Sequence, residues 1–212
     1  MNPHDAPLSI AFPKGRLFDR SRELFAAKGI PIDFDTRKLV ARDAEGRIES
    51  FLVKNSDLPT YVKHGIAGIG VCGGDVLYES GTRFINLGTL PFGSTRMCLA
   101  AKRGYTGSAD RVMKVATKFT GFTKDYFHRR GIPIQIIKLN GSVELAPILG
   151  LAPYIVDLVE TGTTLEANDL VVLEELETIR VHLIANPAYY KLHYERVNAL
   201  ADLVLKELKE ET

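Results

Sequence analysis

The feature that most constrains the fold is a regular alternation of strand-like and helix-like segments along the 212-residue chain. Residues 8–12 form a short apolar strand pattern. The stretch that follows has one helical face made by Leu17, Phe18, Ser21, Leu24 and Phe25. Strands that alternate with helices indicate an α/β fold with a largely parallel sheet.

The same alternation continues to the end of the chain. It predicts further strands at 48–54, 68–72, 96–101, 112–117, 134–139, 155–159, 171–176 and 179–184. It predicts short helices after Ser56–Asp57 and over 75–80, 123–130 and 143–149, and a long amphipathic helix over 187–211.

A turn-rich segment, Pro91-Phe92-Gly93, interrupts the pattern and is a plausible hinge between two lobes. We expect a discontinuous first lobe over 1–91 plus 180–212 and a second lobe over 92–179. No flexible linker joins them, so the lobes should pack closely. A ligand would then bind in the cleft between them, at the carboxyl ends of the strands.

Composition excludes several classes of protein. Lys and Arg total 27 and Asp and Glu total 26, so the net charge is +1, which argues against a general nucleic-acid binder. No apolar run approaches the ~20 residues of a membrane span, and the start does not resemble a signal peptide, so we expect a cytoplasmic protein.

Cys72 and Cys98 lack CxxC spacing, which favours buried, reduced thiols. The five histidines show no metal-ligand spacing, and we expect no metal-ligating side chains.

The most informative segment is the strand at 155–159 and the turn after it. Asp157 and Glu160 precede the sequence Thr161-Gly162-Thr163-Thr164. Gly162 allows successive backbone N–H groups to converge, and three threonine hydroxyls add donors for one phosphate. The carboxylates can accept hydrogen bonds from adjacent ribose hydroxyls. This combination suits a phosphoribosyl group, although a strand followed by an ordinary polar turn would have a similar composition.

Other strand ends carry charged residues. Lys14-Gly15-Arg16 lies where the first strand meets the first helix, so it combines two cations with a helix N-terminus; a solvated loop is an equally good interpretation. Arg37 and Lys38 are by default a surface charge pair. Glu144 is expected in the first turn of a helix, where it would suit the helix dipole or face the cleft. Lys118 is a further cation at a strand end.

Together, these residues match a known family. The chain resembles the short-form catalytic subunit of ATP phosphoribosyltransferase, the first enzyme of histidine biosynthesis. The matching stretches are 12–17, Thr36-Arg37-Lys38-Leu39, 56–62, Ala116-Thr117-Lys118-Phe119, 140–147 and 157–168. They are spread in order over nearly the whole chain.

The resemblance implies two α/β lobes like those of periplasmic binding proteins, with the active site in the cleft between them. It implies that N1 of ATP attacks C1 of phosphoribosyl pyrophosphate, with Mg²⁺, to give N1-(5-phosphoribosyl)-ATP and pyrophosphate. Thr161, Gly162, Thr163 and Thr164 would hold the 5-phosphate, and Glu144 and Asp157 the ribose hydroxyls. Arg16 and Arg37 would be catalytic, and Lys14, Gly15, Arg16 and Lys54 would bind ATP or pyrophosphate.

The sequence also departs from the family's pattern. Lys54 stands where the family often has Arg, Gly74 where it often has Lys, and Asp169 where it often has Gly. Nothing in the chain corresponds to the regulatory domain of the long form. The resemblance therefore implies a separate regulatory subunit like histidyl-tRNA synthetase, and a homodimer within a hetero-oligomer. The alternatives are a nucleobase phosphoribosyltransferase and a non-catalytic two-lobed binding protein.

Overall fold

The computed structural model describes residues 6–34, 37–107 and 112–206. The chain divides into two compact units, Met1–Gly93 with Arg180–Thr212 (unit 1) and Ser94–Ile179 (unit 2). The first boundary lies two residues later than the one expected at 91, and the second lies at the expected position. Each unit contains one sheet with helices on both faces.

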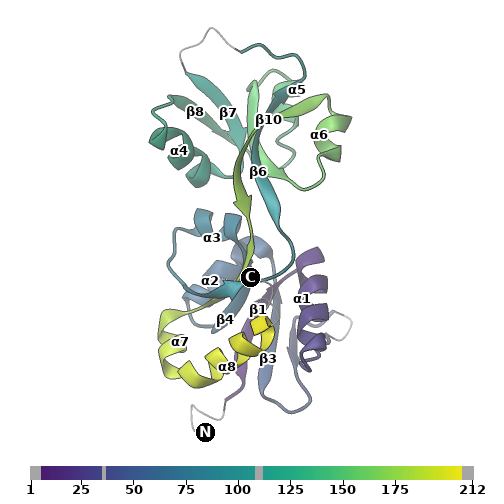
Figure 1. The fold of residues 1–212 in the computed structure, drawn as a ribbon, viewed down its shortest axis with the longest axis vertical. Helices are drawn as coiled ribbons and strands as arrows, with labels where there is room; N and C mark the ends of the chain where they lie inside the picture. The colour runs from purple at the N-terminus through teal and green to yellow at the C-terminus, as the bar shows by residue number, and fades with distance from the viewer. Residues whose placement is uncertain (1–5, 35–36, 108–111, 207–212) are drawn as a thin grey trace. The chain divides into compact units, whose positions relative to one another are not determined.

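Unit 1 is built on a six-stranded sheet in the order β2-β3-β1-β4-β11-β5 (Figure 1). Its strands are β1 (Leu8–Pro13), β2 (Val40–Arg42), β3 (Ile48–Val53), β4 (Ile69–Gly73), β5 (Ile85–Thr89) and β11 (Val181–Ala185). β1 pairs in parallel with β3 and β4, and the remaining pairs are antiparallel. The carboxyl ends of β1, β3 and β4 therefore lie at one edge of the sheet.

The two faces of this sheet carry different helices. α1 (Arg16–Ala27), α7 (Pro187–Leu192) and α8 (Tyr194–Leu205) cover one face, where Phe12 and Phe25 are fully buried. α2 (Leu58–Lys63) and α3 (Gly74–Ser80) cover the other, and a 3₁₀ turn, Asn55–Asp57, leads into α2. The predicted short helix after Ser56–Asp57 is present, but neither side chain caps it, and Ser56 Oγ donates to Asp57 Oδ1.

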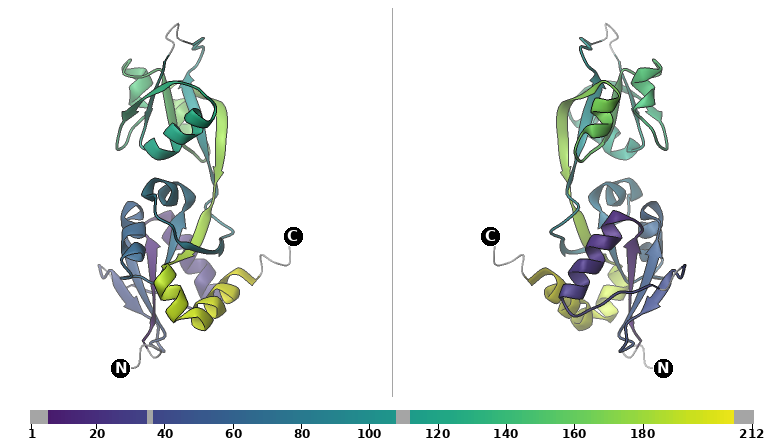
Figure 2. Two further views of the ribbon diagram at one scale, coloured as in Figure 1. Left: turned by 90° about the vertical axis from the view of Figure 1, so that its left-hand side faces the viewer. Right: turned by 90° about the vertical axis from the view of Figure 1, so that its right-hand side faces the viewer.

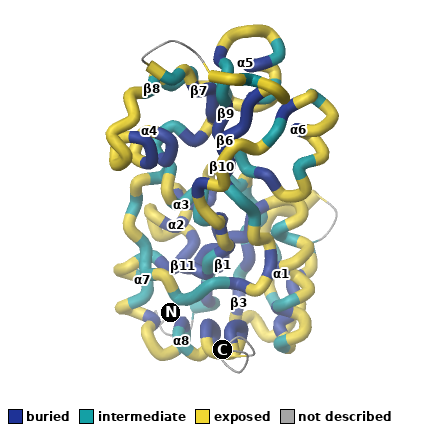
Figure 3. The backbone as a smooth tube through the Cα atoms, turned by 45° about the horizontal axis from the view of Figure 1, so that its top comes forward, coloured by how far each residue is buried: buried dark blue, intermediate teal, exposed yellow. Residues whose placement is uncertain are grey.

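Unit 2 has a five-stranded sheet in the order β10-β6-β9-β7-β8. Its strands are β6 (Thr95–Lys102), β7 (Met113–Thr117), β8 (Ile134–Lys138), β9 (Tyr154–Val159) and β10 (Leu170–Ile179). α4 (Thr120–Arg129) packs on one face, and α5 (Leu145–Ile148) and α6 (Thr163–Ala167) pack on the other. The two views of Figure 2 bring α4 and α6 to the front in turn. Figure 3 shows buried backbone in β6 and β9 and exposed turns around them.

The α/β class is confirmed, but the expectation of largely parallel sheets is wrong. In unit 2, β7 is parallel to β8 and β9, whereas β6 is antiparallel to β9 and β10. The sheet of unit 1 also combines parallel and antiparallel pairs, so both sheets are mixed. The expected strands at 171–176 and 179–184 are instead a long β10 that runs to Ile179 and a separate β11, with only Arg180 between them.

The expected helix over 187–211 is also different. It is broken at His193, whose backbone leaves the helical region (φ −118°, ψ 29°), and α7 and α8 lie on either side. Asn186 caps α7 by accepting hydrogen bonds from the backbone of Ala188 and Tyr189. The expected residues 207–211 lie outside the described ranges. Among the described residues, the short elements that were not predicted are β2, β5, α6 and the 3₁₀ turn at Asn55–Asp57.

Two further observations concern the whole chain. Cys72 in β4 and Cys98 in β6 are both buried and free of disulfides, as expected. Burial raises the pKa of the Cys72 thiol far above its ordinary value. Within the described ranges, no helix has the length and apolar character needed to cross a membrane.

Candidate active site

In unit 2, three parallel strands end side by side and carry most of the predicted phosphoribosyl residues. The register pairs Thr117 of β7 with Lys138 of β8 and with Val156 of β9. The turns that follow these strands contain Lys118, Glu144 and Thr161–Thr164. Because the carboxyl ends of parallel strands share an edge, the fold brings these segments to one edge of the sheet.

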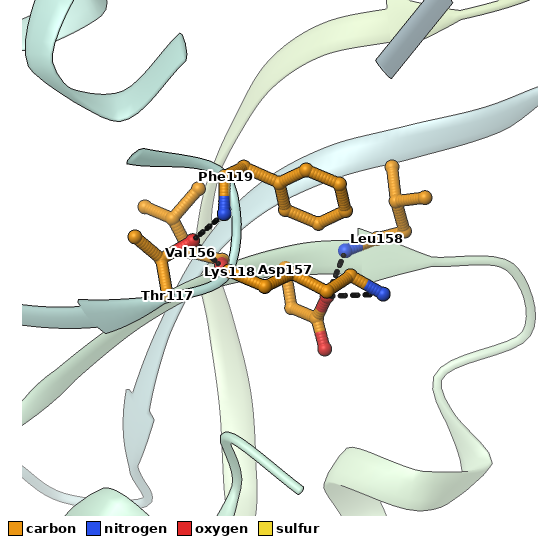
Figure 4. Close-up of polar contacts among 6 residues, drawn as sticks. All are labelled: Thr117, Lys118, Phe119, Val156, Asp157 and Leu158. Carbon is orange, nitrogen blue, oxygen red and sulfur yellow. Dashed lines mark hydrogen bonds and ion pairs between the residues drawn. The ribbon is translucent and has the colours of Figure 1, made fainter. Parts of the chain in front are cut away.

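Asp157 lies on the face of β9 that α5 and α6 cover, and its carboxylate is held in place. The side chain is one-fifth exposed, and its Oδ1 accepts a hydrogen bond of 2.9 Å from the backbone of Leu158. Lys118 Nζ lies 3.8 Å from the same oxygen (Figure 4). The ammonium is also 4.8 Å from the centre of the Phe119 ring. Asp157, the predicted partner of the ribose hydroxyls, therefore has a cation beside it.

The turn that presents Lys118 is fixed by a buried threonine. Thr117 is fully buried, and its Oγ1 donates to the carbonyl of Val156 at 2.6 Å. The same hydroxyl oxygen accepts a hydrogen bond of 2.9 Å from the backbone of Phe119. Thr117 thus ties the end of β7 to β9 and fixes the backbone on both sides of Lys118 (Figure 4).

The Thr161–Thr164 loop is a tight turn that leads directly into α6. Gly162 adopts a left-handed conformation (φ 86°, ψ −4°) that favours glycine, and its carbonyl accepts from the backbone of Glu166 at 3.0 Å. The hydroxyl oxygens of Thr161 and Thr163 are 3.1 Å apart. Thr161, Thr163 and Thr164 are exposed. Leu165 anchors the loop by packing into the core.

Glu144 comes immediately before α5 rather than within its first turn. It is half-buried, and the flanking Val143 and Ala146 belong to the apolar cluster that also contains Val159 and Leu165. Glu144 is therefore held on the same face of the sheet as Asp157. The structure brings together the acidic residues and the threonine loop that the sequence singled out.

In unit 1, the predicted anion-binding residues gather at the carboxyl edge of β1 and β3. Pro13 pairs with Val53, so Lys14 and Lys54 are the first residues beyond two adjacent strands, and the backbone of Lys14 donates to the carbonyl of Val53 at 2.9 Å. Gly15 has φ 89° and begins α1, which places Arg16 in its first turn. Lys14, Gly15, Arg16 and Lys54 are exposed.

Arg37 approaches the same edge from another direction. β2 is antiparallel to β3, so the residues before β2 lie near the end of β3, and the backbone of Leu52 donates to the carbonyl of Leu39. Arg37 is exposed and has a positive φ of 78°, which is uncommon for a residue with a side chain. Thr36 of the same motif lies outside the described residues. Arg37 is therefore an exposed residue of the segment that leads toward the end of β3, the strand that Lys54 follows.

Two departures from the family pattern have structural counterparts. Asp169 has φ 54°, a conformation that glycine adopts without strain and that Asp tolerates better than most residues. Its carboxylate accepts from Arg103 Nε at 3.3 Å. Gly74 begins α3, and a Cβ there would lie 3.3 Å from the carbonyl oxygen of Arg180. A side chain at position 74 would require a small local adjustment.

The sequence of this chain is similar to those of known proteins. The family model for ATP phosphoribosyltransferase matches residues 54–207. An ATP phosphoribosyltransferase of Clostridioides difficile is 43% identical over 199 residues, covering 92% of this chain and 96% of that protein. The chain belongs to the ATP phosphoribosyltransferase family. The family resemblance read from the sequence is confirmed, and with it a catalyst of the first step of histidine biosynthesis.

Solved structures agree with this family and with the fold. A chain of the ATP phosphoribosyl transferase (HisG:HisZ) complex from Thermotoga maritima has a TM-score of 0.82 and 37% identity, covering 96% of this chain and all of that one. A histidine kinase sensor domain with similarity to periplasmic binding proteins has a TM-score of 0.58 at 14% identity, covering 99% of this chain and 94% of that one. This second likeness concerns the fold alone and confirms the expected resemblance to periplasmic binding proteins.

Proposed function

We propose that this chain joins N1 of ATP to C1 of phosphoribosyl pyrophosphate and releases pyrophosphate. The bond from C1 to the pyrophosphate oxygen breaks, its electron pair leaves with pyrophosphate, and the N1 lone pair forms the new bond. The product is N1-(5-phosphoribosyl)-ATP. One observation supports this proposal most directly: Glu144, Asp157 and the Thr161–Thr164 loop lie at one edge of the unit 2 sheet.

Unit 2 supplies the groups that a phosphoribosyl moiety needs. The backbone and hydroxyls of Thr161–Thr164 donate to the 5-phosphate, and the carboxylates of Glu144 and Asp157 accept from the ribose hydroxyls. Fixing the sugar in this way orients C1 for attack, and orientation of two bound substrates is a large source of rate. N1 of adenine carries a lone pair and no proton, so attack needs no strong general base.

Unit 1 supplies positive charge for the leaving group and for ATP. As C1 becomes oxocarbenium-like, negative charge builds on pyrophosphate, and Arg16 and Arg37 stabilise it in the transition state. Lys14, Gly15 and Lys54 bind ATP or pyrophosphate from the same edge. Lys54 acts as a point charge, because an ammonium lacks the two-pronged geometry of the arginine that the family often has at this position.

Magnesium is part of the proposal as the partner of pyrophosphate. Mg²⁺ usually keeps several waters and binds the phosphate oxygens of the substrate, and we expect those oxygens, rather than side chains of this chain, to be its main ligands. Among the described residues, no cluster of three His, Cys, Asp or Glu side chains is arranged to hold a metal. We expect the magnesium ion to enter the site already bound to the phosphates of the substrate. When bound, the ion would neutralise part of the pyrophosphate charge.

A second protein completes the proposal. The related structure from Thermotoga maritima is a HisG:HisZ complex. We infer that this chain likewise works with a regulatory subunit like histidyl-tRNA synthetase, as a homodimer within a hetero-oligomer. The cytoplasm is the expected location, because the reaction consumes ATP and phosphoribosyl pyrophosphate.

The proposal is tested by mixing the purified chain with ATP, phosphoribosyl pyrophosphate and Mg²⁺, with and without the synthetase-like partner, and following product absorbance. Parallel reactions omit Mg²⁺ or replace ATP by free adenine. We expect product from ATP only when the metal is present. Absence of product in both mixtures would refute the catalytic assignment. Product from adenine but not from ATP would instead favour a nucleobase phosphoribosyltransferase.

A further inference from the structure

The sequence marks Lys118 only as a cation at a strand end, without a role in the site, yet the structure places it against a predicted site residue, Asp157. Its ammonium is 3.8 Å from Asp157 Oδ1, although the two residues are 39 positions apart in the chain. The lysine side chain is 44% exposed and the aspartate side chain 20%, so the pair is accessible to a ligand.

We propose that Lys118 is a positioning residue for phosphoribosyl pyrophosphate, acting through Asp157. It orients the carboxylate to accept a ribose hydroxyl, and it offsets the negative charge that would otherwise repel the substrate. This inference rests on the proposed function, because it requires Asp157 to face the sugar.

The geometry supports the orienting role. Both contacts that the carboxylate makes in Figure 4, from Lys118 Nζ and from the backbone of Leu158, converge on Oδ1. Two contacts on one oxygen determine the rotation of the carboxylate about its final bond. A sugar hydroxyl that approaches the other oxygen, Oδ2, would meet an acceptor whose direction is already set, so less ordering remains to be done on binding.

The position of Lys118 is itself determined by its neighbours. Thr117 is buried and bonded on both sides, which fixes the backbone of the turn. The Phe119 ring, which is almost fully buried, lies under the ammonium at 4.8 Å. A lysine that only covered an exposed surface would not need these two supports.

The charge argument follows from the substrate. Phosphoribosyl pyrophosphate carries a phosphate and a pyrophosphate, and an uncompensated carboxylate within a few ångströms of it would weaken binding. An ammonium 3.8 Å from the carboxylate offsets part of its negative charge. The benefit should therefore disappear when Asp157 itself is made neutral.

The experiment measures binding of phosphoribosyl pyrophosphate by titration calorimetry and the KM for each substrate by steady-state kinetics. The variants are Lys118→Met, Lys118→Arg, Asp157→Asn and the double variant Lys118→Met/Asp157→Asn. Lys114→Met is the matched control, because Lys114 is an exposed lysine near the start of β7, whereas Lys118 is the first residue after the end of that strand. Urea unfolding of each variant verifies that it is folded.

We expect Lys118→Met to raise the Kd and KM for phosphoribosyl pyrophosphate about tenfold, while the KM for ATP changes by less than about twofold. Lys118→Arg should recover most of the loss, and Lys114→Met should behave as the unaltered chain. In the Asp157→Asn background, the same lysine substitution should change the Kd by less than about twofold.

Two results would overturn the inference while leaving the proposed function intact. One is an unchanged Kd in folded Lys118→Met. The other is an equal loss in the presence and absence of the Asp157 charge, which would mean that Lys118 contacts the phosphates directly. If the unaltered chain neither binds phosphoribosyl pyrophosphate nor forms product, the proposed function fails, and this inference fails with it.

Discussion

Replacing Thr117 by valine tests whether one buried hydroxyl fixes the phosphoribosyl edge of unit 2. The side chain is fully buried, and valine has nearly the same shape, so the substitution removes the hydroxyl while adding little strain. It leaves the carbonyl of Val156 without the 2.6 Å bond and the backbone N–H of Phe119 without the 2.9 Å bond.

The magnitude follows from these two bonds. A buried polar group that loses its partner costs about 1–3 kcal/mol, so two such groups cost about 2–6 kcal/mol. Burial of the additional methyl group offsets about 1 kcal/mol. We therefore expect Thr117→Val to lower the free energy of unfolding by about 1–5 kcal/mol, with a middle value of about 3 kcal/mol.

Thr117→Ser provides the control, since serine keeps the hydroxyl and loses only one buried methyl, which costs about 1 kcal/mol. Urea unfolding at constant m value measures both variants. With an m value of about 2 kcal/mol per molar, the valine variant should lower the midpoint by about 0.5–2.5 M, or about 1.5 M at the middle value. A valine variant at least as stable as the serine variant would refute the reasoning, because the methyl group rather than the hydroxyl would then be the stabilising part.

Three further predictions concern other parts of the molecule. Arg16→Ala and Arg37→Ala should each lower kcat about 10²-fold or more in steady-state assays, and near-normal kcat in both would remove their catalytic roles. Gly68→Ala should destabilise the chain by about 1–3 kcal/mol in urea, because the new Cβ would clash with the edge of the Tyr189 ring. As the check, adding Gly68→Ala to a Tyr189→Ala chain should cost much less stability than adding it to the unaltered chain. Burial lowers the pKa of His182, and a neighbouring arginine lowers it further. The unfolded chain therefore binds more protons than the folded chain, and the free energy of unfolding should fall as the pH drops below about 6.5. His182→Gln should reduce that fall between pH 8 and 5.5, and an unchanged pH profile would contradict this origin.

The sequence predicted best those features that depend on neighbouring residues. The apolar run at 155–159, its acidic residue and the glycine turn after it are local, and β9 and the Thr161–Thr164 loop appear where they were expected. Gly162 could be assigned its turn because its left-handed conformation is one that glycine favours. α1 likewise has the expected buried face around Ser21 and Phe25.

The features that the sequence did not predict depend on strand pairing. The antiparallel placement of β6 and β10 comes from contacts between distant segments, which periodicity does not report. The contact between Lys118 and Asp157 has the same origin, because it exists only when Thr117 is in register with Val156. The sequence did contain one indication that Lys118 could lie near a ligand. Lys118 directly follows a predicted strand, and ligands of parallel sheets bind at the carboxyl ends of the strands.

The near-zero net charge of the chain is compatible with a reaction between two highly anionic substrates because charge acts locally. At physiological salt, interactions between exposed charges fade beyond about 8 Å, so charges elsewhere on the surface contribute little at the reacting atoms. The chain places Lys14 and Lys54 beyond two adjacent strands of unit 1, and Lys118 beside the one carboxylate of unit 2 that is fixed on β9. We therefore expect position within each sheet, rather than the total of 27 cationic and 26 anionic side chains, to decide which anions the protein can hold.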